Sequence, residues 1–277
     1  MTGLDQAELK LLTDLIQARF GLTFNGIRME ILASRLRPRL RELHLSTLRD
    51  YYQYLRFHPE RESELARLPA MVTNNETYFF RETHQFDLLV SHVVPERRAA
   101  LRGRPFRVLS AGCSSGEEPY SLSIALHNAG LALAGVTWEI DACDLNTERV
   151  ARAQEALYAE SSLRACDADA RRKYFVAEPG GFRLRDKYRT GVRVFHANLM
   201  APNGALGWSV YDAILCRNML IYVSDEAFAN LIGLFARSLL PGGYLFLGHS
   251  ESLLDRKTAF APAMVSGAVV YRKLEAA

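Results

Sequence analysis

The chain has 277 residues, of which 49% are apolar, and its 34 Lys and Arg residues against 31 Asp and Glu leave a formal net charge of +3. This length accommodates one large and one small globular domain. So small a net charge says little about partners, whereas the lack of any apolar run of about 18 residues argues against a membrane-spanning helix. The N-terminus shows no basic segment followed by an apolar one, so we expect no secretion.

The four cysteines, Cys113, Cys143, Cys166 and Cys216, are scattered along the chain without a Cys-x-x-Cys pair. That spacing argues against a metal site and against a disulfide framework. Unpaired thiols are typical of reducing compartments, so we expect a cytoplasmic protein with no bound metal and no membrane insertion.

Residues 1–72 predict a small all-α domain, because apolar residues recur there at helical spacing and no strand pattern is present. A basic cluster lies within it, formed by Arg35, Arg37, Arg39 and Arg41, in which positions four apart share a helix face. A solvated basic surface is one interpretation, and a docking surface for an acidic partner is the other. Aromatic side chains are not interleaved with these arginines, so we expect an acidic helical protein as partner and no nucleic acid.

Residues 73–84 predict a linker that contributes to a ligand site. Polar residues, among them Asn75 and Thr77, precede three consecutive aromatic residues, and Arg81 follows them. Ligand sites favour the interfaces between domains, which makes this segment a candidate wall of a cleft. The alternative is a hydrophobic plug beside an exposed arginine.

The stretch 106–121 predicts a strand, a turn and a helix in succession. Its first residues are apolar, the next are small, and Pro119 falls near the first turn of the helix, where its missing N–H is tolerated. Gly112 and Gly116 allow the backbone of the turn to approach a ligand closely. In an open α/β sheet such a turn lies at the carboxyl ends of the strands, where ligands bind.

Two carboxylates, Glu117 and Glu118, stand at the end of this turn. They would repel a phosphate but suit a ligand with an ammonium or sulfonium group, which favours S-adenosylmethionine over NAD or ATP. A nicotinamide dehydrogenase is further disfavoured because the turn lacks the third glycine of the dinucleotide motif. The alternative interpretation is an ordinary helix N-terminus, where the helix dipole favours acidic residues.

Three later strand-like segments also end in polar residues. The first of them ends at Asp144, which is placed to accept both ribose hydroxyls of a nucleoside or, alternatively, to cap the next helix. The next ends at Asn198, which we expect at an adenine edge with Leu199 against the ring face. The last ends in Arg217 and Asn218.

The order of these elements predicts an α/β fold, with a Rossmann-like S-adenosylmethionine-dependent methyltransferase domain at residues 85–277. A helix at 225–239 and a strand at 244–248 organise its last third. A hairpin around residues 178–181 predicts a small antiparallel β-subdomain inserted at about 170–192. The all-α domain and the linker precede this catalytic domain.

A set of short motifs runs through the chain in the order Asn75-x-Thr77-x-Phe79-Phe80-Arg81, Gly116-Glu-Glu-Pro-Tyr-Ser121, Asp144, Asn198-Leu199, Cys216-Arg-Asn218 with Ile221-Tyr222, and Gly248-His-Ser-Glu251. In this combination, over nearly the whole chain, they resemble the bacterial chemotaxis receptor methyltransferases of the CheR family. The resemblance implies methyl transfer from S-adenosylmethionine to glutamate side chains of chemoreceptors, giving γ-methyl esters and S-adenosylhomocysteine in chemotaxis adaptation. The implied partner is the cytoplasmic helical region of the receptors, and we expect the enzyme to be a monomer.

The resemblance also implies roles for individual residues. The cofactor site would be lined by Asn75, Thr77, Arg81, Glu117, Asp144, Asn198, Leu199, Arg217 and Asn218. Arg81 and Tyr222 would lie beside the reacting centre as catalytic residues. The acidic receptor helices would dock on Arg35, Arg37, Arg39 and Arg41. Some members use the β-subdomain to grip a tethering peptide of the receptor, and the short hairpin here predicts a member that works without a tether.

The implied chemistry needs no general base, because a glutamate with a pKa of about 4.3 is already ionised at neutral pH. The protein has to strip water from the carboxylate and align it with the methyl–sulfur axis. We expect Arg81 to orient carboxylate charge and Tyr222 to hydrogen-bond the attacking oxygen. Two other functions stay open, an O-methyltransferase of small molecules and a non-catalytic receptor adaptor that senses the cofactor.

Overall fold

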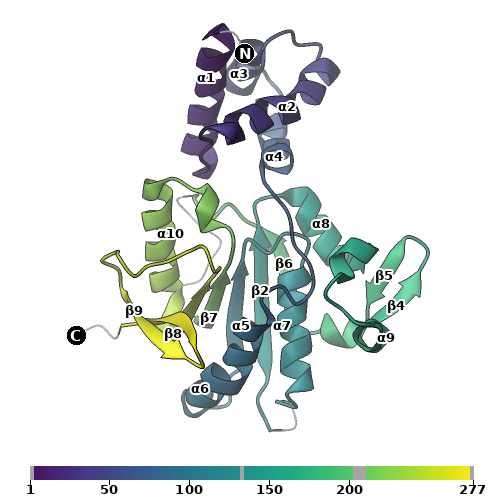
Figure 1. Cartoon of the computed structure of the whole chain (residues 1–277), viewed down its shortest axis with the longest axis vertical. Helices are drawn as coiled ribbons and strands as arrows, with labels where there is room; N and C mark the ends of the chain where they lie inside the picture. The colour runs from purple at the N-terminus through teal and green to yellow at the C-terminus, as the bar shows by residue number, and fades with distance from the viewer. Residues whose placement is uncertain (1–2, 132–133, 202–209, 275–277) are drawn as a thin grey trace.

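The computed structural model describes residues 3–131, 134–201 and 210–274. An all-helical domain lies beyond one end of the strands of a sheet that has helices on both faces, and a small β-subdomain lies beside the sheet (Figure 1). The predicted α/β fold class, with an all-α N-terminal domain and an inserted antiparallel subdomain, is confirmed. No described helix is both long and apolar enough to cross a membrane.

The N-terminal domain consists of α1 (Gly3–Phe20), α2 (Ile27–Glu42), α3 (Leu48–Phe57) and α4 (Arg61–Val72). The apolar faces of these helices form one core, in which Leu12, Leu36 and Leu68 are fully buried. A capping box begins α3, because the Thr47 and Asp50 side chains each accept the other residue's backbone N–H. Helical spacing of apolar residues therefore suffices to predict this domain.

The main sheet consists of β1 (Phe106–Ala111), β2 (Trp138–Asp144), β6 (Val192–His196), β7 (Tyr211–Cys216), β8 (Leu239–Leu247), β9 (Phe260–Val265) and β10 (Ala268–Lys273). Its strand order is β6-β2-β1-β7-β8-β10-β9. The strands from β6 to β8 are parallel, whereas β10 pairs antiparallel with β8 and with β9. The chain order reverses beside β1, and a crevice at the carboxyl ends of β1, β2 and β7 follows from that reversal.

Helices cover both faces of this sheet (Figure 1). They are α5 (Thr83–Leu88), α6 (Val94–Leu101), α7 (Glu117–Asn128), α8 (Thr147–Glu155) and α10 (Asp225–Ser238), with a π-helical turn at Leu89–Val93 between α5 and α6. One apolar cluster joins α10 to β7 and β8, and another joins α5, α6 and α7 to β1. Burial on both faces accounts for the continuous apolar centres of the parallel strands.

Two features of the last third differ from the expectation. A strand was expected at residues 244–248 after a turn, but β8 begins at Leu239 and continues through that turn with an irregular register opposite β7. Strand β9, which pairs with β10 and forms the outer edge of the sheet, could not be predicted from the residue pattern. Pairing with an edge strand is a tertiary effect that residue pattern alone does not specify.

The β-subdomain is an antiparallel sheet of β3 (Leu157–Tyr158), β5 (Gly181–Leu184) and β4 (Phe175–Glu178) in that order, and α9 (Ala168–Tyr174) precedes β4. The expected range of about 170–192 contains the hairpin but not β3, because a two-residue strand leaves no alternation pattern. Gly181 is needed where β5 crosses β3, since a Cβ there would lie 2.3 Å from the Tyr158 carbonyl oxygen. Short 3₁₀ helices occur at Glu160–Leu163, Asp186–Tyr188 and Leu220–Tyr222.

Candidate functional site

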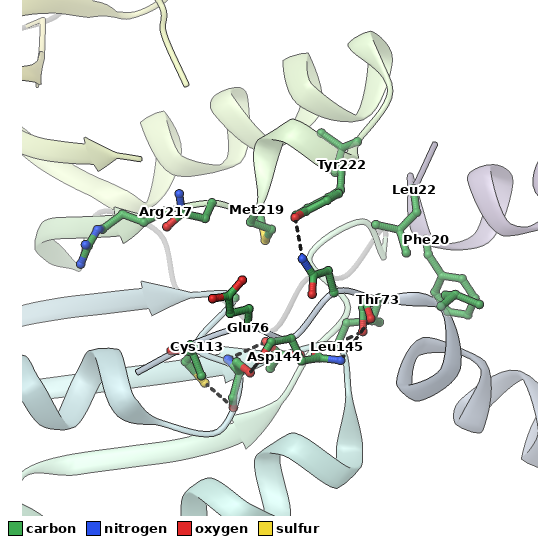
Figure 2. Close-up of a pocket in the computed structure, with 18 of the residues that line it drawn as sticks. Phe20, Leu22, Thr73, Glu76, Cys113, Asp144, Leu145, Arg217, Met219 and Tyr222 are labelled. Carbon is green, nitrogen blue, oxygen red and sulfur yellow. Dashed lines mark hydrogen bonds between the residues drawn. The ribbon is translucent and has the colours of Figure 1, made fainter. Parts of the chain in front are cut away.

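A cavity of about 390 Å³ lies between the N-terminal domain and the carboxyl ends of the parallel strands (Figure 2). Its walls combine apolar side chains of the N-terminal domain, such as Phe20 and Leu22, with linker residues 73–78 and with the residues that follow β1, β2, β6 and β7. This volume, and apolar walls that carry a limited number of polar groups, are typical of small-molecule and cofactor sites.

The linker is both a plug and a wall of the cavity. The Phe79 ring is fully buried and lies edge-on to Tyr158 and Phe175, with ring centroids 4.7 and 4.8 Å apart. Asn75 and Thr77, by contrast, line the cavity. The two interpretations of this segment therefore apply to different residues within it.

Arg81 also lines the cavity from the linker. Its side chain is half-buried, and Nη1 donates a hydrogen bond to the Glu76 carbonyl oxygen at 3.1 Å. Its guanidinium carbon lies 6.0 Å from the centroid of the Tyr78 ring. No carboxylate within the described ranges forms an ion pair with Arg81, so its other N–H groups can serve a ligand.

The turn between β1 and α7 brings backbone N–H groups close to the carboxyl end of β2. Ser114 has a φ of 48° and donates its backbone N–H to Asp144 Oδ2 at 2.8 Å. Gly112 has a φ of 79°, and a Cβ on it would lie 2.9 Å from the sulfur of Met219, which also lines the cavity. A larger residue at Gly112 would therefore be strained and would crowd the site.

Asp144 does not cap the helix that follows β2. Asn146 does so, because its Oδ1 accepts the backbone N–H groups of Glu148 and Arg149. The Asp144 carboxylate instead accepts the N–H groups of Ser114 and Asn146, at 2.8 Å each, and lines the cavity. Burial raises its pKa above the usual value, even though both N–H groups favour the ionised form.

Glu118 is the member of the acidic pair that lines the cavity. Its Oε1 accepts a hydrogen bond from the Ser110 hydroxyl at 2.6 Å, and its Oε2 lies 3.3 Å from Arg217 Nη1. The Arg217 side chain is 2% exposed, and its Nη2 lies 3.3 Å from Glu82 Oε2. One buried cation thus faces two carboxylates, and burial raises the pKa of Glu118 in spite of Arg217.

Glu117 does not line this cavity, which corrects its expected place in the cofactor site. Successive residues of an α-helix point about 100° apart, so Glu117 turns away when Glu118 faces the cavity. Glu117 is 1% exposed, and its Oε1 accepts a hydrogen bond from the Ser162 hydroxyl at 2.8 Å. Its Oε2 has no hydrogen-bond partner within the described part of the chain, and burial raises its pKa.

Asn198 and Leu199 line the cavity after β6. The Asn198 amide is engaged on both sides, because Oδ1 accepts the Met200 N–H at 3.0 Å and Nδ2 donates to the Arg19 carbonyl oxygen at 3.1 Å. The second bond reaches α1. Asn198 therefore joins the two domains as well as lining the site between them.

The loop after β7 carries Arg217, Asn218 and Tyr222, and Glu251 holds it in place. Glu251 Oε2 accepts the backbone N–H of Asn218 at 2.9 Å, and Oε1 accepts that of Leu220 at 2.6 Å. These bonds support Asn218 at a φ of 59°, a left-handed conformation. Glu251 belongs to one of the sequence motifs, but its role could not be predicted, since its partners lie 31 and 33 residues away.

Tyr222 lies at the edge of the cavity, opposite the linker (Figure 2). Its hydroxyl accepts a hydrogen bond from Asn74 Nδ2 at 3.1 Å, and the Arg28 guanidinium lies 5.0 Å from the ring centroid. No described residue accepts the hydroxyl proton, so this proton is available to a ligand. Neither Asn74 nor Arg28 could be identified in advance, because both reach Tyr222 through the packing of the two domains.

Arg39 is a structural residue, which corrects its expected role in docking. Its Nη2 lies 2.5 Å from Glu64 Oε2 and its Nη1 lies 2.7 Å from Glu42 Oε2. Glu64 is 3% exposed and also accepts a hydrogen bond from the Tyr51 hydroxyl at 2.8 Å. The Arg39 guanidinium is thus committed to the interior of the N-terminal domain.

The other three arginines of the basic cluster have different surroundings. Arg35 lines the cavity and donates hydrogen bonds to the carbonyl oxygens of Val72 and Thr73. Arg37 and Arg41 are exposed and form no ion pair with any described residue. The cluster therefore divides into one half-buried, ion-paired residue, one residue at the cavity and two that face solvent.

The donor and acceptor set of the cavity fits S-adenosylmethionine. Glu118 and Asp144 offer carboxylate oxygens to an ammonium group, a sulfonium group or ribose hydroxyls, and Arg81 offers N–H donors to a carboxylate. Apolar surface for a base comes from residues such as Leu145 and Leu199. Glu76 also lines the cavity, and three carboxylates there are unfavourable for a phosphate group.

Two family models match the chain. The model described as CheR methyltransferase, SAM binding domain, matches residues 75–268, and the model described as CheR methyltransferase, all-alpha domain, matches residues 7–68. Residues 69–74, which include the end of α4 and the start of the linker, separate the two matched ranges.

Curated proteins are similar over most of the chain. Chemotaxis protein methyltransferase 2 of Vibrio cholerae is 35% identical over 241 residues, which cover 87% of this chain and 83% of that protein. Chemotaxis protein methyltransferase 1 of Pseudomonas aeruginosa is 31% identical over 273 residues, covering 96% of this chain and 97% of that protein. The probable biofilm formation methyltransferase WspC of Pseudomonas aeruginosa is 32% identical over 260 residues, covering 94% of this chain and 60% of that protein.

Proposed function

This chain belongs to the CheR methyltransferase family, and we propose that Arg81 and Tyr222 position a receptor glutamate in its cavity for methylation. The enzyme transfers a methyl group from S-adenosylmethionine to glutamate side chains of chemoreceptors in chemotaxis, giving γ-methyl esters and S-adenosylhomocysteine. One observation carries the assignment of roles. Arg81, Glu118, Arg217 and Tyr222 come from three separate segments of the chain and line the same cavity.

Cofactor binding divides among the polar groups of the cavity in this proposal. Glu118 takes the positively charged end of the cofactor, since its carboxylate lines the cavity beside the β1–α7 turn. Asp144 takes the ribose hydroxyls at the end of β2. The remaining residues of the proposed cofactor site are Asn75, Thr77, Arg81, Asn198, Leu199, Arg217 and Asn218.

The transfer step asks the protein for positioning and not for proton removal. A glutamate carboxylate is ionised at neutral pH, because its ordinary pKa is about 4.3. Well-oriented reactants can gain roughly 7–11 kcal/mol from positioning alone. The apolar walls contributed by Phe20 and Leu22 help to exclude water from this carboxylate, which strengthens its interactions with the protein.

Arg81 and Tyr222 orient the reacting carboxylate in complementary ways. Arg81 uses one N–H on the Glu76 carbonyl oxygen, which limits how fully it can clamp a substrate. A bidentate clamp would hold the ground state too tightly and quench the nucleophile, so partial engagement suits the reaction. Tyr222 receives a hydrogen bond from Asn74, and its own proton is then directed to the substrate oxygen.

Receptor docking is assigned to α2, and specifically to Arg37 and Arg41, with Arg35 at the cavity. Arg37 and Arg41 are exposed and unpaired among the described residues, which suits long-range attraction to an acidic helix. The β4–β5 hairpin has a two-residue connection, and we propose that no receptor peptide tethers the enzyme there.

The proposal includes a cytoplasmic, monomeric enzyme. Its four cysteines are free and buried, in keeping with a reducing compartment. The proposed function also places the enzyme in the cytoplasm, because the receptor region that it methylates lies there. Light scattering of the purified protein checks the monomeric state.

The test is transfer of labelled methyl groups from S-adenosylmethionine to cytoplasmic fragments of chemoreceptors. Arg81→Ala should nearly abolish transfer with the fold intact by circular dichroism. Tyr222→Phe should lower kcat roughly 10²-fold, the typical effect of removing one donor from a reacting oxygen. Tyr54→Phe, which removes a partly exposed hydroxyl from α3, is the matched control and should keep wild-type kcat.

The outcomes separate the residue roles from the activity. Wild-type kcat in Tyr222→Phe would remove Tyr222 from the reacting centre while leaving the activity in place. Absence of label from every receptor fragment with the wild-type enzyme would refute the proposed substrate itself.

A further inference from the structure

Two hollows lie beside the cofactor cavity and share wall residues with it. The first, of about 290 Å³, lies against α8 and the β-subdomain, and we name it the α8 hollow. The second, of about 490 Å³, lies between α2, α4 and α8, and we name it the interdomain hollow. Asn75 and Glu76 line both hollows and the cavity, so all three open around the same two linker residues.

Arginines dominate the charge of these hollows. Arg149, Arg152 and Arg164 line the α8 hollow, and Arg35 and Arg149 line the interdomain hollow. Arg149 belongs to both. The basic surface is therefore continuous from α2 of the N-terminal domain to α8 of the catalytic domain.

Few acidic groups within the hollows oppose these arginines. Glu76 is paired with Arg164, at 2.7 Å between Oε1 and Nη2. Glu117 is 1% exposed, so its carboxylate lies beneath the surface of the α8 hollow. Arg149 and Arg152 form no ion pair or side-chain hydrogen bond with any residue in the described ranges.

We propose that Arg35, Arg149 and Arg152 form a second docking surface for an acidic helical segment of the receptor, next to the cavity. This inference rests on the proposed function, since the receptor is the partner it concerns. Charge complementarity argues for the occupant, because four arginines face Glu76 and the buried Glu117 in the two hollows. The position of the docking surface is supported by its continuity with the cavity, because a helix bound there passes the linker residues that line the cofactor site.

A surface on both domains constrains the substrate more than α2 alone. A helix held only by Arg37 and Arg41 can pivot about one contact. Contact with α8 as well fixes its direction across the mouth of the cavity, and remote binding energy is then used to orient the glutamate.

The test compares charge reversals in the full-length enzyme. Arg152→Glu, and the double variant with Arg149→Glu, are assayed for KM and kcat with a receptor cytoplasmic fragment, and S-adenosylhomocysteine affinity is measured by calorimetry. Arg152 carries the decisive variant, because Arg149 is within electrostatic reach of Asp144. The matched control is Arg102→Glu with Lys257→Glu, two exposed residues that make no ion pair with described residues. Arg102 follows α6, at the far end of the sheet from the N-terminal domain (Figure 1).

The expected result is a roughly tenfold rise in KM for the double variant, reduced salt dependence of KM, and cofactor affinity within about twofold of wild type for Arg152→Glu. An unchanged KM in the α8 variants, with active wild-type enzyme, overturns the inference and leaves the proposed function standing. An equal rise in the control pair, or duplex DNA that competes as strongly as the receptor fragment, shows general attraction of polyanions and also overturns it. Failure of the wild-type enzyme to methylate any fragment overturns the proposed function together with this inference.

Discussion

Replacing Arg39 by Ala should destabilise the N-terminal domain, whereas replacing Arg37 by Ala should not. Arg39 is the counter-charge of Glu64, whose side chain is 3% exposed. Without Arg39, Glu64 retains only the hydrogen bond from Tyr51. Removing one partner of a buried ion pair costs about 3–5 kcal/mol, and because Glu64 can also take up a proton we expect the lower end, about 3 kcal/mol.

Hydrogen exchange measured by mass spectrometry on peptides from α2 and α4 is the suitable assay. A loss of about 3 kcal/mol in the opening free energy accelerates exchange on the order of 10²-fold, since each 1.4 kcal/mol is a factor of ten. Exposed substitutions usually change stability by less than about 0.5 kcal/mol, so peptides of the Arg37→Ala variant should exchange at wild-type rates. Equal exchange in both variants would refute the assignment of Arg39 to the domain interior.

The same ion pair predicts the pH dependence of the domain. Burial alone would raise the pKa of Glu64, but the hydrogen bonds from Arg39 and Tyr51 outweigh burial and lower this pKa. A carboxyl with a lowered folded-state pKa stabilises the fold above its unfolded pKa of about 4.3, and the contribution is lost as pH falls through the folded value. The stability difference between wild type and Arg39→Ala should therefore shrink in acid.

Three further outcomes follow from the cavity. Arg217→Met leaves Glu118 and Glu82 without their shared cation, so we expect stability to fall by about 3–5 kcal/mol and cofactor binding to weaken. Thermal unfolding measures the first effect and calorimetry the second, and an unchanged melting temperature would contradict the buried triad. Glu251→Gln leaves a loop N–H unsatisfied and should lower kcat about tenfold or more; kinetics equal to wild type would show that Glu251 does not position the loop. Burial raises the pKa values of Glu118 and Asp144, so these groups take up protons at a higher pH than ordinary carboxyl groups of pKa about 4. As the pH is lowered, affinity for S-adenosylmethionine should therefore begin to fall above about pH 4. An affinity that calorimetry finds constant down to about pH 4 would argue against both groups as ligands.

The convergence of Asp144, Asn198 and Arg217 on one cavity could be predicted from the sequence. Each lies at or just after the carboxyl end of a strand, and the carboxyl ends of parallel strands lie on the same side of a sheet. These predictions succeed because they depend on local pattern and on a general rule of sheet geometry.

The choice between Glu117 and Glu118 could not be predicted, because it depends on the rotation of α7 about its axis at its first turn. The role of Arg39 could not be predicted either, since its partner Glu64 lies 25 residues away on another helix. Spacing within α2 shows which arginines share a face but not which face is buried. In both cases the deciding contact is tertiary, and the sequence pattern is compatible with either outcome.

The position of Tyr222 depends on the N-terminal domain as much as on the catalytic domain. The Tyr222 carbonyl oxygen accepts the Thr23 N–H at 2.8 Å, Leu22 forms an isolated β-bridge with Val223, and Arg28 lies against the Tyr222 ring. These contacts come from the loop that leads into α2 and from the first turn of α2, the helix to which receptor docking is assigned. In the proposed function the receptor therefore docks on an element that directly contacts the proposed catalytic tyrosine.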